Sequence, residues 1–214
     1  MHINNNYIVE KNIYYAFFDV DETIIQEKSM FSFLSYYSKK MALKFNIFTV
    51  IKYLFFISLI KYLKFKKAPR DYINKIYYRF YKGIEINTLN NFGNEWFNEA
   101  RKKNNFFKPN IINEIRSHKM NGAKVIFVSG SFQACLKPIA EYLDIDEILC
   151  TEMEVVNEKY TGKLLNIPAI GKGKLILIKR IFLFVHYYMT LDMDLSATQQ
   201  KNLPHLVTKN GQKK

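Results

Sequence analysis

The fold of this chain is decided by one stretch, Ile13-Tyr14-Tyr15-Ala16-Phe17-Phe18-Asp19-Val20-Asp21-Glu22-Thr23. Its first six residues form an unbroken apolar run rich in aromatic side chains, which predicts a strand buried on both faces. Two carboxylates and a hydroxyl follow at once. In open α/β sheets, ligand sites lie just beyond the carboxyl ends of such strands. The stretch therefore predicts an α/β fold and places a candidate site at Asp19.

The two aspartates allow two interpretations. Polar turn residues that cap a strand would explain a bare Asp-x-Asp. If the extended backbone continues past Val20, however, Asp19 and Asp21 share a face of the strand. Two like charges so close together repel each other unless a cation or a shared proton offsets them. The threonine that completes Asp-x-Asp-x-Thr makes the pattern more specific and favours the functional interpretation.

Length and charge limit the alternatives. A chain of 214 residues accommodates one α/β domain with an insertion, or two small domains. The net charge of +13 is concentrated between Tyr36 and Lys82, where twelve Lys or Arg residues face one acidic residue, Asp71, for a local charge of +11. A general bias toward lysine does not remove acidic residues from one segment. We therefore expect a local positive field there.

Two features indicate the compartment. The first residues lack the basic-then-apolar pattern of a secretory signal. Cys135 and Cys150 lie in apolar segments without metal-type spacing, so we expect reduced thiols in the core. Together these features predict a cytoplasmic protein.

Helical signals fill residues 30–104. Pro69 is a typical helix start and Gly83 a typical stop, and Asn87-Thr88 can cap a further helix. The apolar run in 41–67 is interrupted by lysines and falls short of the roughly 20 residues that a membrane span needs. We expect a packed helix there, with a basic helix lying on a membrane surface as the alternative.

The α/β pattern returns after residue 106. Pro109 opens a helix that Asn121-Gly122 ends, and 124–129 reads as a second buried strand. A helix through Tyr142, a strand around 148–151 and a hairpin over 152–163 follow. This order predicts one parallel-sheet domain, interrupted after its first strand by an all-helical insertion that lies above Asp19.

The residues at the strand ends permit phosphate-ester chemistry. Asp19 can act as a nucleophile that forms an aspartyl-phosphate, and Asp21 can act as general acid and then base. Ser129 and the amides near Gly130 can hold phosphoryl oxygens, although an ordinary strand-to-helix turn explains them equally well. Lys174 is ordinarily a solvated lysine, and its spacing is wrong for a nucleotide-binding P-loop. Its order in the chain, after Asp19 and Ser129, gives it weight.

In that order these motifs resemble the haloacid dehalogenase (HAD) superfamily, and in particular its subfamily IB, which includes phosphoserine phosphatase. The segment Phe18 to Thr23, followed by Lys28-Ser29-Met30-Phe31-Ser32-Phe33, carries the resemblance. It implies a Rossmann-like parallel-sheet core in 1–28 and 105–214, and a helical cap in 29–104.

The resemblance also implies roles. Asp19 corresponds to the nucleophile, Asp21 to the acid/base, and Ser129 to the phosphate-binding hydroxyl. Lys174, rather than Lys172, corresponds to the lysine of the third motif. The resemblance implies Mg²⁺, held in part by the carboxylate of Asp19 and the backbone carbonyl of Asp21. We therefore expect a Mg²⁺-dependent phosphomonoesterase, with a weakened or inactive HAD-like binding module as the alternative.

Two departures from the family pattern bear on substrate and metal. Lys28 stands where phosphoserine phosphatases carry a glutamate, although Glu27 adjoins it. With the basic insertion, this predicts a small phosphate ester that is anionic beyond its phosphate, or is presented at an anionic surface, and is not phosphoserine. Peripheral contact with an anionic membrane stays open. Nucleic-acid binding is less favoured, because most aromatics in the insertion recur at helical spacing.

The fourth motif should supply a third carboxylate for the metal. The ending Asn202-Leu203-Pro204-His205-Leu206 resembles the family's, but Thr198 and Asn202 stand at the aspartate positions. Asp192 could serve instead, or Asp194, if the apolar run before them is a strand. If that run is helical, the fourth strand is lost and the metal site is weak. The second interpretation is the one favoured here.

Overall fold

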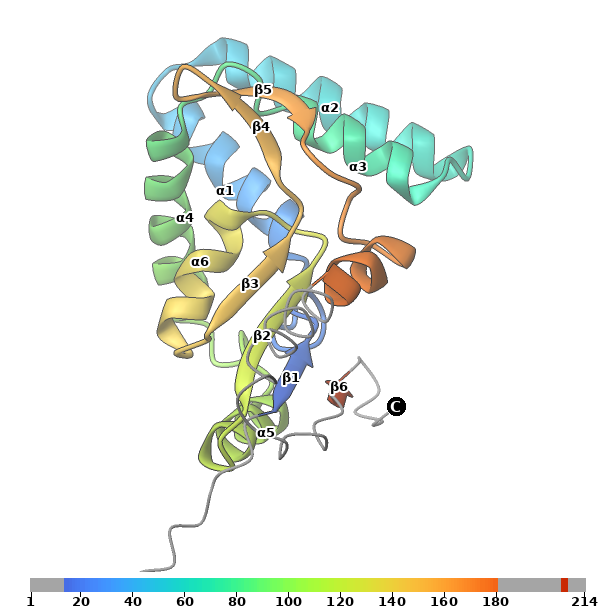
Figure 1. Ribbon diagram of the computed structural model, residues 1–214. Coiled ribbons are helices and arrows are strands. Elements are labelled where there is room, and N and C mark those ends of the chain that lie inside the picture. Colours follow the sequence, from blue (N-terminus) through green and yellow to red (C-terminus); the bar gives the residue numbers. More distant parts are fainter. Residues whose placement is uncertain (1–13, 181–204, 208–214) are drawn as a thin grey trace, which may run out of the picture.

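A four-stranded sheet forms the centre of the fold (Figure 1). The computed structural model describes residues 14–180 and 205–207. The strand order is β3 (Glu147–Cys150), β2 (Lys124–Ser129), β1 (Tyr15–Phe18) and β6 (His205–Val207), and every neighbouring pair is parallel. The carboxyl ends of β1 and β2 therefore meet at one edge. The predicted α/β fold with a parallel sheet is confirmed.

The first strand is buried on both faces because its apolar side chains alternate between two clusters. Phe18 packs with Phe127 in the larger hydrophobic cluster. Phe17 packs with Ile126 in a smaller cluster, to which Ile178 contributes from the helical residues 172–180. This is the pattern expected of a central parallel strand that has cover on each side.

The prediction that a fourth strand is lost is wrong. His205–Val207 forms β6 and pairs in parallel with β1, with Phe18 opposite Val207. Pro204, which lacks an amide donor, directly precedes this short strand, a position that a sheet tolerates. His205 and Leu206, which were expected to lie after the fourth strand, thus belong to it. Residues 181–204, with Asp192, Asp194, Thr198 and Asn202, lie outside the described residues.

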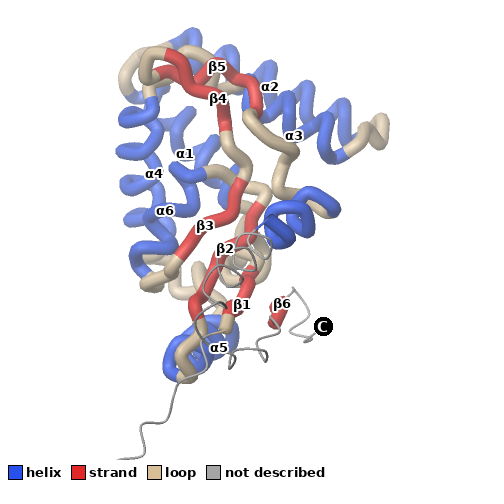
Figure 2. Tube along the Cα trace, in the orientation of Figure 1, coloured by secondary structure: helices blue, strands red, loops and turns tan. Residues whose placement is uncertain are grey.

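A helical layer lies beyond the carboxyl ends of the strands (Figures 1 and 2). It consists of α1 (Ser29–Leu43), α2 (Ile47–Phe65), α3 (Arg70–Arg79) and α4 (Ile86–Ala100), which we call the cap helices. The hairpin of β4 (Met153–Val156) and β5 (Lys159–Leu164) packs on α3. One hydrophobic cluster joins the cap helices to the sheet. The exact domain boundaries therefore stay a prediction.

Helix starts agree with the sequence signals except at α4. Pro69 directly precedes α3, as predicted, and Gly83 adopts a φ of 83° shortly after it. The predicted cap at Asn87-Thr88 is wrong, because α4 begins at Ile86. The Ile86 amide donates to the Glu158 carbonyl at 3.0 Å, and Glu85 forms an antiparallel β-bridge with Lys159 of the hairpin. This pairing between distant segments fixes the start of α4.

The rest of the α/β part follows the prediction. Helix α5 (Pro109–Met120) begins at its proline, and α6 (Gln133–Tyr142) follows β2. Cys135 and Cys150 are free and buried, as expected.

Helix α2 is packed over one face only. Its buried residues are Phe56 and Ile60, so it is a packed helix, as expected from the sequence, although its other side is exposed. Among the described residues, no helix is long and apolar enough to cross a membrane.

Candidate active site

A tight turn after β1 sets the positions of Asp19 and Asp21. The carbonyl of Val20 accepts hydrogen bonds from the amides of Thr23, Ile24 and Ile25, which reverses the chain directly beyond the strand. The backbone of Val20 also donates to Asp19 Oδ1 at 2.9 Å. Both aspartates are half-buried and line one pocket. The prediction that they form one site agrees with this geometry.

Lys174 pairs with Asp19. Its Nζ lies 2.6 Å from Asp19 Oδ1, although the two residues are far apart in the sequence. A Cβ at Gly173 would lie 2.0 Å from the Pro168 carbonyl oxygen, so only glycine allows the loop to approach so closely before Lys174. Lys172 is exposed. The structure thus brings Lys174 to the nucleophile candidate, as the sequence order suggested.

Asp21 lies at the amino end of α1. Its Oδ1 accepts the amide hydrogen of Ser29, the first residue of that helix, at 2.9 Å. Burial raises the pKa of Asp21 and the charge of Asp19 adds to this, while the hydrogen bonds from Ser29 and the charge of Lys174 act the other way. A carboxyl with a raised pKa is the kind that can hold a proton for transfer.

The turn after β2 is tied into the same region by buried hydroxyls. Ser129 Oγ accepts the Ser131 amide at 3.1 Å, and Ser29 Oγ donates to Ser131 Oγ at 2.8 Å. The carbonyl of Gly130 accepts from the hydroxyls of Tyr78, at 2.7 Å, and Thr151, at 3.0 Å. Gly130 lines the site pocket, whereas the buried Ser129 is not among its lining residues.

The site pocket has a volume of about 840 Å³ and lies between the strand ends and the cap. Its basic lining residues are Lys28, Lys64, Arg70 and Lys174, and its acidic ones are Asp19, Asp21 and Glu22. Asn74 also lines it, with a buried Nδ2 that has no hydrogen-bond partner. A pocket with converging cations and amide donors suits an anionic ligand.

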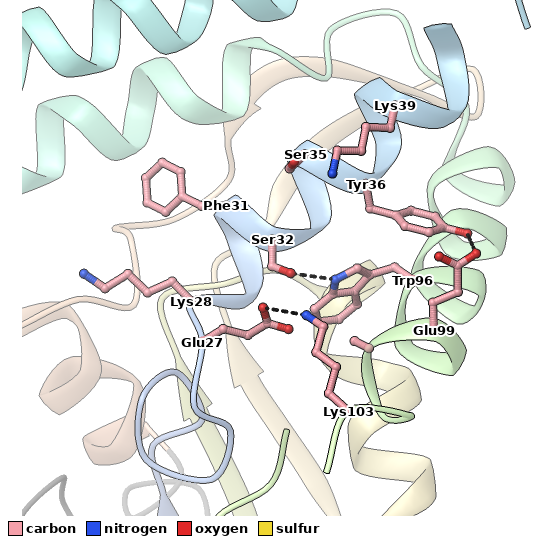
Figure 3. A pocket seen from close by; sticks show the side chains of 11 residues that line it. Glu27, Lys28, Phe31, Ser32, Ser35, Tyr36, Lys39, Trp96, Glu99 and Lys103 are labelled. Carbon is pink, nitrogen blue, oxygen red and sulfur yellow. Dashed lines mark hydrogen bonds and ion pairs between the residues drawn. The ribbon is translucent and has the colours of Figure 1, made fainter. Parts of the chain in front are cut away.

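A second pocket, of about 720 Å³, lies on the other side of Lys28 and Phe31, which line both (Figure 3). Glu27 lines only this second pocket, where its Oε2 lies 3.4 Å from Lys103 Nζ. In Figure 3 its carboxylate points toward Lys103, and Lys28 points away from it. Glu27 therefore does not take the place of the glutamate that Lys28 replaces.

The two aspartates are a partial match to a metal site. Among the described residues, no group of three His, Cys, Asp or Glu side chains could hold a metal ion. Mg²⁺ is commonly bound by one or two carboxylates together with substrate phosphate oxygens and water. Asp19 and Asp21 supply that minimum.

The sequence alone predicts no role for Ser29, Tyr78 and Thr151, whose hydrogen bonds hold the two strand-end turns. For Ser29 the available signal is its position eight residues after Asp21. Tyr78 and Thr151 meet at one carbonyl, and no local sequence pattern predicts such a meeting.

Comparison with known proteins agrees with this geometry. A family model described as haloacid dehalogenase-like hydrolase matches residues 16–191. The chain belongs to this family. No curated protein matches it.

Three solved structures share the fold. A protein of unknown function from Bordetella pertussis Tohama I has a TM-score of 0.64 at 14% identity, with 81% of this chain and 76% of that chain covered. A phosphoserine phosphohydrolase-like protein from Francisella tularensis subsp. tularensis SCHU S4 gives 0.52 at 17%, covering 78% and 73%. An apo phosphoserine phosphatase gives 0.50 at 15%, covering 83% and 72%. This HAD hydrolase thus has the fold of phosphoserine phosphatases.

Proposed function

We propose that this HAD hydrolase is a Mg²⁺-dependent phosphomonoesterase that forms a covalent aspartyl-phosphate on Asp19. The observation that carries the proposal is the contact of 2.6 Å between Lys174 Nζ and Asp19 Oδ1, in a pocket that also holds Asp21. A nucleophile, a proton donor and a cation then converge where a phosphoryl group would bind.

The chemistry proceeds in two steps. A carboxylate oxygen of Asp19 attacks phosphorus, the bond from phosphorus to the ester oxygen breaks, and the leaving oxygen takes a proton from Asp21. Asp21 then accepts a proton from water, which attacks phosphorus and breaks the bond to Asp19. Inorganic phosphate leaves and both carboxyl groups return to their starting states. The raised pKa of Asp21 suits the first proton transfer.

Positive charge stabilises the transferring group. Lys174 neutralises charge on Asp19 and on the phosphoryl oxygens. The buried Ser129 hydroxyl does not line the pocket and supports the turn after β2 by accepting the Ser131 amide. Mg²⁺, when bound by the Asp19 carboxylate and the Asp21 backbone carbonyl, would offset phosphate charge. Because no group of three His, Cys, Asp or Glu side chains among the described residues could hold a metal ion, we expect weak Mg²⁺ binding and low turnover.

The proposed substrate is a small phosphate ester with a further negative charge. Lys28, Lys64 and Arg70 line the pocket together with Asp19, Asp21 and Lys174. Cations in a cleft wall raise the local concentration of an anionic substrate. A carboxylate or second phosphate on the substrate would meet these cations, whereas the ammonium group of phosphoserine would meet the like charge of Lys28.

A screen of phosphate esters with wild type and Asp19→Asn, each with and without Mg²⁺, tests the proposal. We expect phosphate release by wild type with Mg²⁺ only, and none by the nearly isosteric variant. If wild type releases no phosphate from any ester yet binds esters in the pocket, the chain is a HAD-like binding module instead. Phosphoserine as the best substrate would overturn the assignment of an anionic ester.

A further inference from the structure

Helix α2 has an outer face that is apolar and uncovered. Seven of its apolar side chains are more than half exposed, with Phe48 at 84%, Phe55 at 70% and Phe65 at 80%. All seven fall on one side of the helix at steps of one, three or seven residues: Ile47, Phe48, Ile51, Leu54, Phe55, Tyr62 and Phe65. We call this set the outer face. Soluble proteins rarely expose so many large apolar residues together.

The opposite side holds α2 to the molecule. Phe56 and Ile60 are buried, and the ring of Phe56 lies 5.3 Å from that of Phe80. Lys52 Nζ donates to the Phe80 carbonyl at 2.5 Å. Helix α2 runs along the outer edge of the cap with its length parallel to α3 (Figure 1). A helix anchored in this way can lie on a surface but cannot insert across one.

Charge identifies what covers the outer face. Residues 28–70 contain ten Lys or Arg and no Asp or Glu. Lys44 precedes α2, Lys61 lies within it, and Lys66 and Lys67 follow it, all of them exposed. Lysines at both ends of an apolar face are the arrangement that binds anionic headgroups while the apolar side chains enter the acyl boundary. A second copy of the chain would bring two such positive segments together and be repelled.

Nucleic acid would bind the lysines around α2 but not the aliphatic side chains of its outer face. Lysine binds the phosphates of a nucleic-acid backbone, and aromatic side chains stack on exposed bases. The aliphatic side chains Ile47, Ile51 and Leu54 gain nothing from either. They gain free energy when hydrocarbon removes them from water.

We infer that the outer face of α2, with its flanking lysines, binds the surface of an anionic lipid bilayer and holds the cap against it. Lys64 and Ala68 line the site pocket, so the lipid-binding surface adjoins that pocket. The inference does not depend on the phosphatase reaction, because binding can be measured without substrate.

The test is flotation of the full chain with vesicles of phosphatidylcholine alone, or with phosphatidylglycerol added, at low and high salt. The apolar variant is Phe48→Ser/Ile51→Ser/Phe55→Ser, and its control changes exposed apolar residues elsewhere: Met120→Ser, Val156→Ser and Leu165→Ser. The charge variant replaces Lys44, Lys61, Lys66 and Lys67 with Gln, and its control replaces Lys102, Lys124, Lys137 and Lys163. Circular dichroism checks that each variant is folded.

We expect wild type to float with the anionic vesicles and to lose binding as salt rises. The charge variant should lose at least about tenfold in affinity for them, since each lysine near such a surface contributes on the order of 1 kcal/mol. The apolar variant should lose a similar factor, and both controls should bind as wild type does.

Absence of wild-type binding to either vesicle would overturn the inference. Equal binding by the apolar variant and its control would also overturn it. If vesicle binding is absent, two further results would contradict the inference. One is a dimer that the apolar variant abolishes, and the other is salt-dependent retention of the wild type on RNA or DNA.

Discussion

At the scale of single residues, the account depends on which side chains face the pocket. Lys172 and Lys174 are two residues apart in one loop, yet one is exposed and the other lies 2.6 Å from Asp19. Lys28 and Glu27 are adjacent, yet they turn to different sides of the cap. In the first pair, Lys172 serves as an internal control for Lys174.

Lys174→Gln should lower kcat/KM by on the order of a hundredfold or more, which is the usual cost of removing one preorganised charge partner. Lys172→Gln, which removes the same charge from the same loop, should leave turnover within about twofold of wild type. Steady-state kinetics with the best ester and saturating Mg²⁺ measures both. Equal losses in the two variants would mean that Lys174 acts only through the net charge of the loop.

Lys28→Gln should raise KM for an anionic ester severalfold at low salt and change kcat little, because a charge in the cleft wall aids binding rather than chemistry. The effect should shrink as ionic strength rises. Lys39→Gln is the matched control, since Lys39 lines only the second pocket. A fall in kcat without a change in KM would place Lys28 in the chemical step instead.

At the scale of elements, close approach and burial fix the cap on the sheet. Helices α4 and α6 meet at Gly93, where an added Cβ would lie 1.9 Å from the Ala134 carbonyl oxygen. Helix α3 inserts two buried tyrosine side chains, Tyr77 and Tyr78, and the turn after it adds Tyr81; the Tyr78 hydroxyl donates to the Gly130 carbonyl in the site turn. The packing of these helices thus reaches the candidate active site.

Gly93→Ala should lower the free energy of unfolding by about 1–3 kcal/mol, because the two helices must move apart to admit a methyl group. Asn94→Ala, at the exposed neighbouring position of the same helix, should change it by no more than about 0.5 kcal/mol. Urea denaturation compares the two variants. A stabilised Gly93→Ala would show that α4 and α6 are less closely packed than this structure has them.

The buried tyrosines predict alkaline instability. Burial raises the pKa values of Tyr77, Tyr78 and Tyr81 well above the usual range. In the unfolded chain they ionise near pH 10, so above that pH the unfolded state loses protons that the folded state keeps. Their stabilising effect is complete below about pH 10 and falls by up to about 1.4 kcal/mol per pH unit for each tyrosine above it.

Thermal unfolding from about pH 9 to about pH 11 measures this loss. Tyr77→Phe should reduce the slope of stability against pH in the alkaline range, whereas Tyr72→Phe, at an exposed position, should leave it unchanged. Tyrosinate absorbance that rises before the fold is lost and that Tyr77→Phe, but not Tyr72→Phe, reduces would contradict the account.

At the scale of the whole molecule, the sequence predicted what local pattern determines. The aromatic run before Asp19 predicted a strand covered on both faces, and Phe17 and Phe18 do pack on opposite sides. The prolines at 69 and 109 predicted two helix starts. Asp19 and Asp21 were predicted from their position just beyond the first strand, and Lys174 from its order in the chain after Asp19 and Ser129.

The rest depends on pairing between distant segments, which one sequence does not display. The start of α4 is set by the hairpin at Glu158, and β6 is a strand because β1 offers it an open edge. For the same reason, the sequence did not predict which side of α2 is exposed. Its residues are apolar on every side, so the pattern could not show which side lacks a partner.

The central claim is that Asp19 carries the phosphoryl group, and trapping the intermediate tests it most directly. Wild type is quenched with acid during turnover of its best ester with Mg²⁺, and the peptide that contains Asp19 is examined by mass spectrometry. The account predicts a phosphoryl group on Asp19 that hydroxylamine removes, and neither this adduct nor phosphate release in Asp19→Asn. Phosphate release by Asp19→Asn at the wild-type rate, or a phosphoryl group on another residue of the wild type, would contradict it.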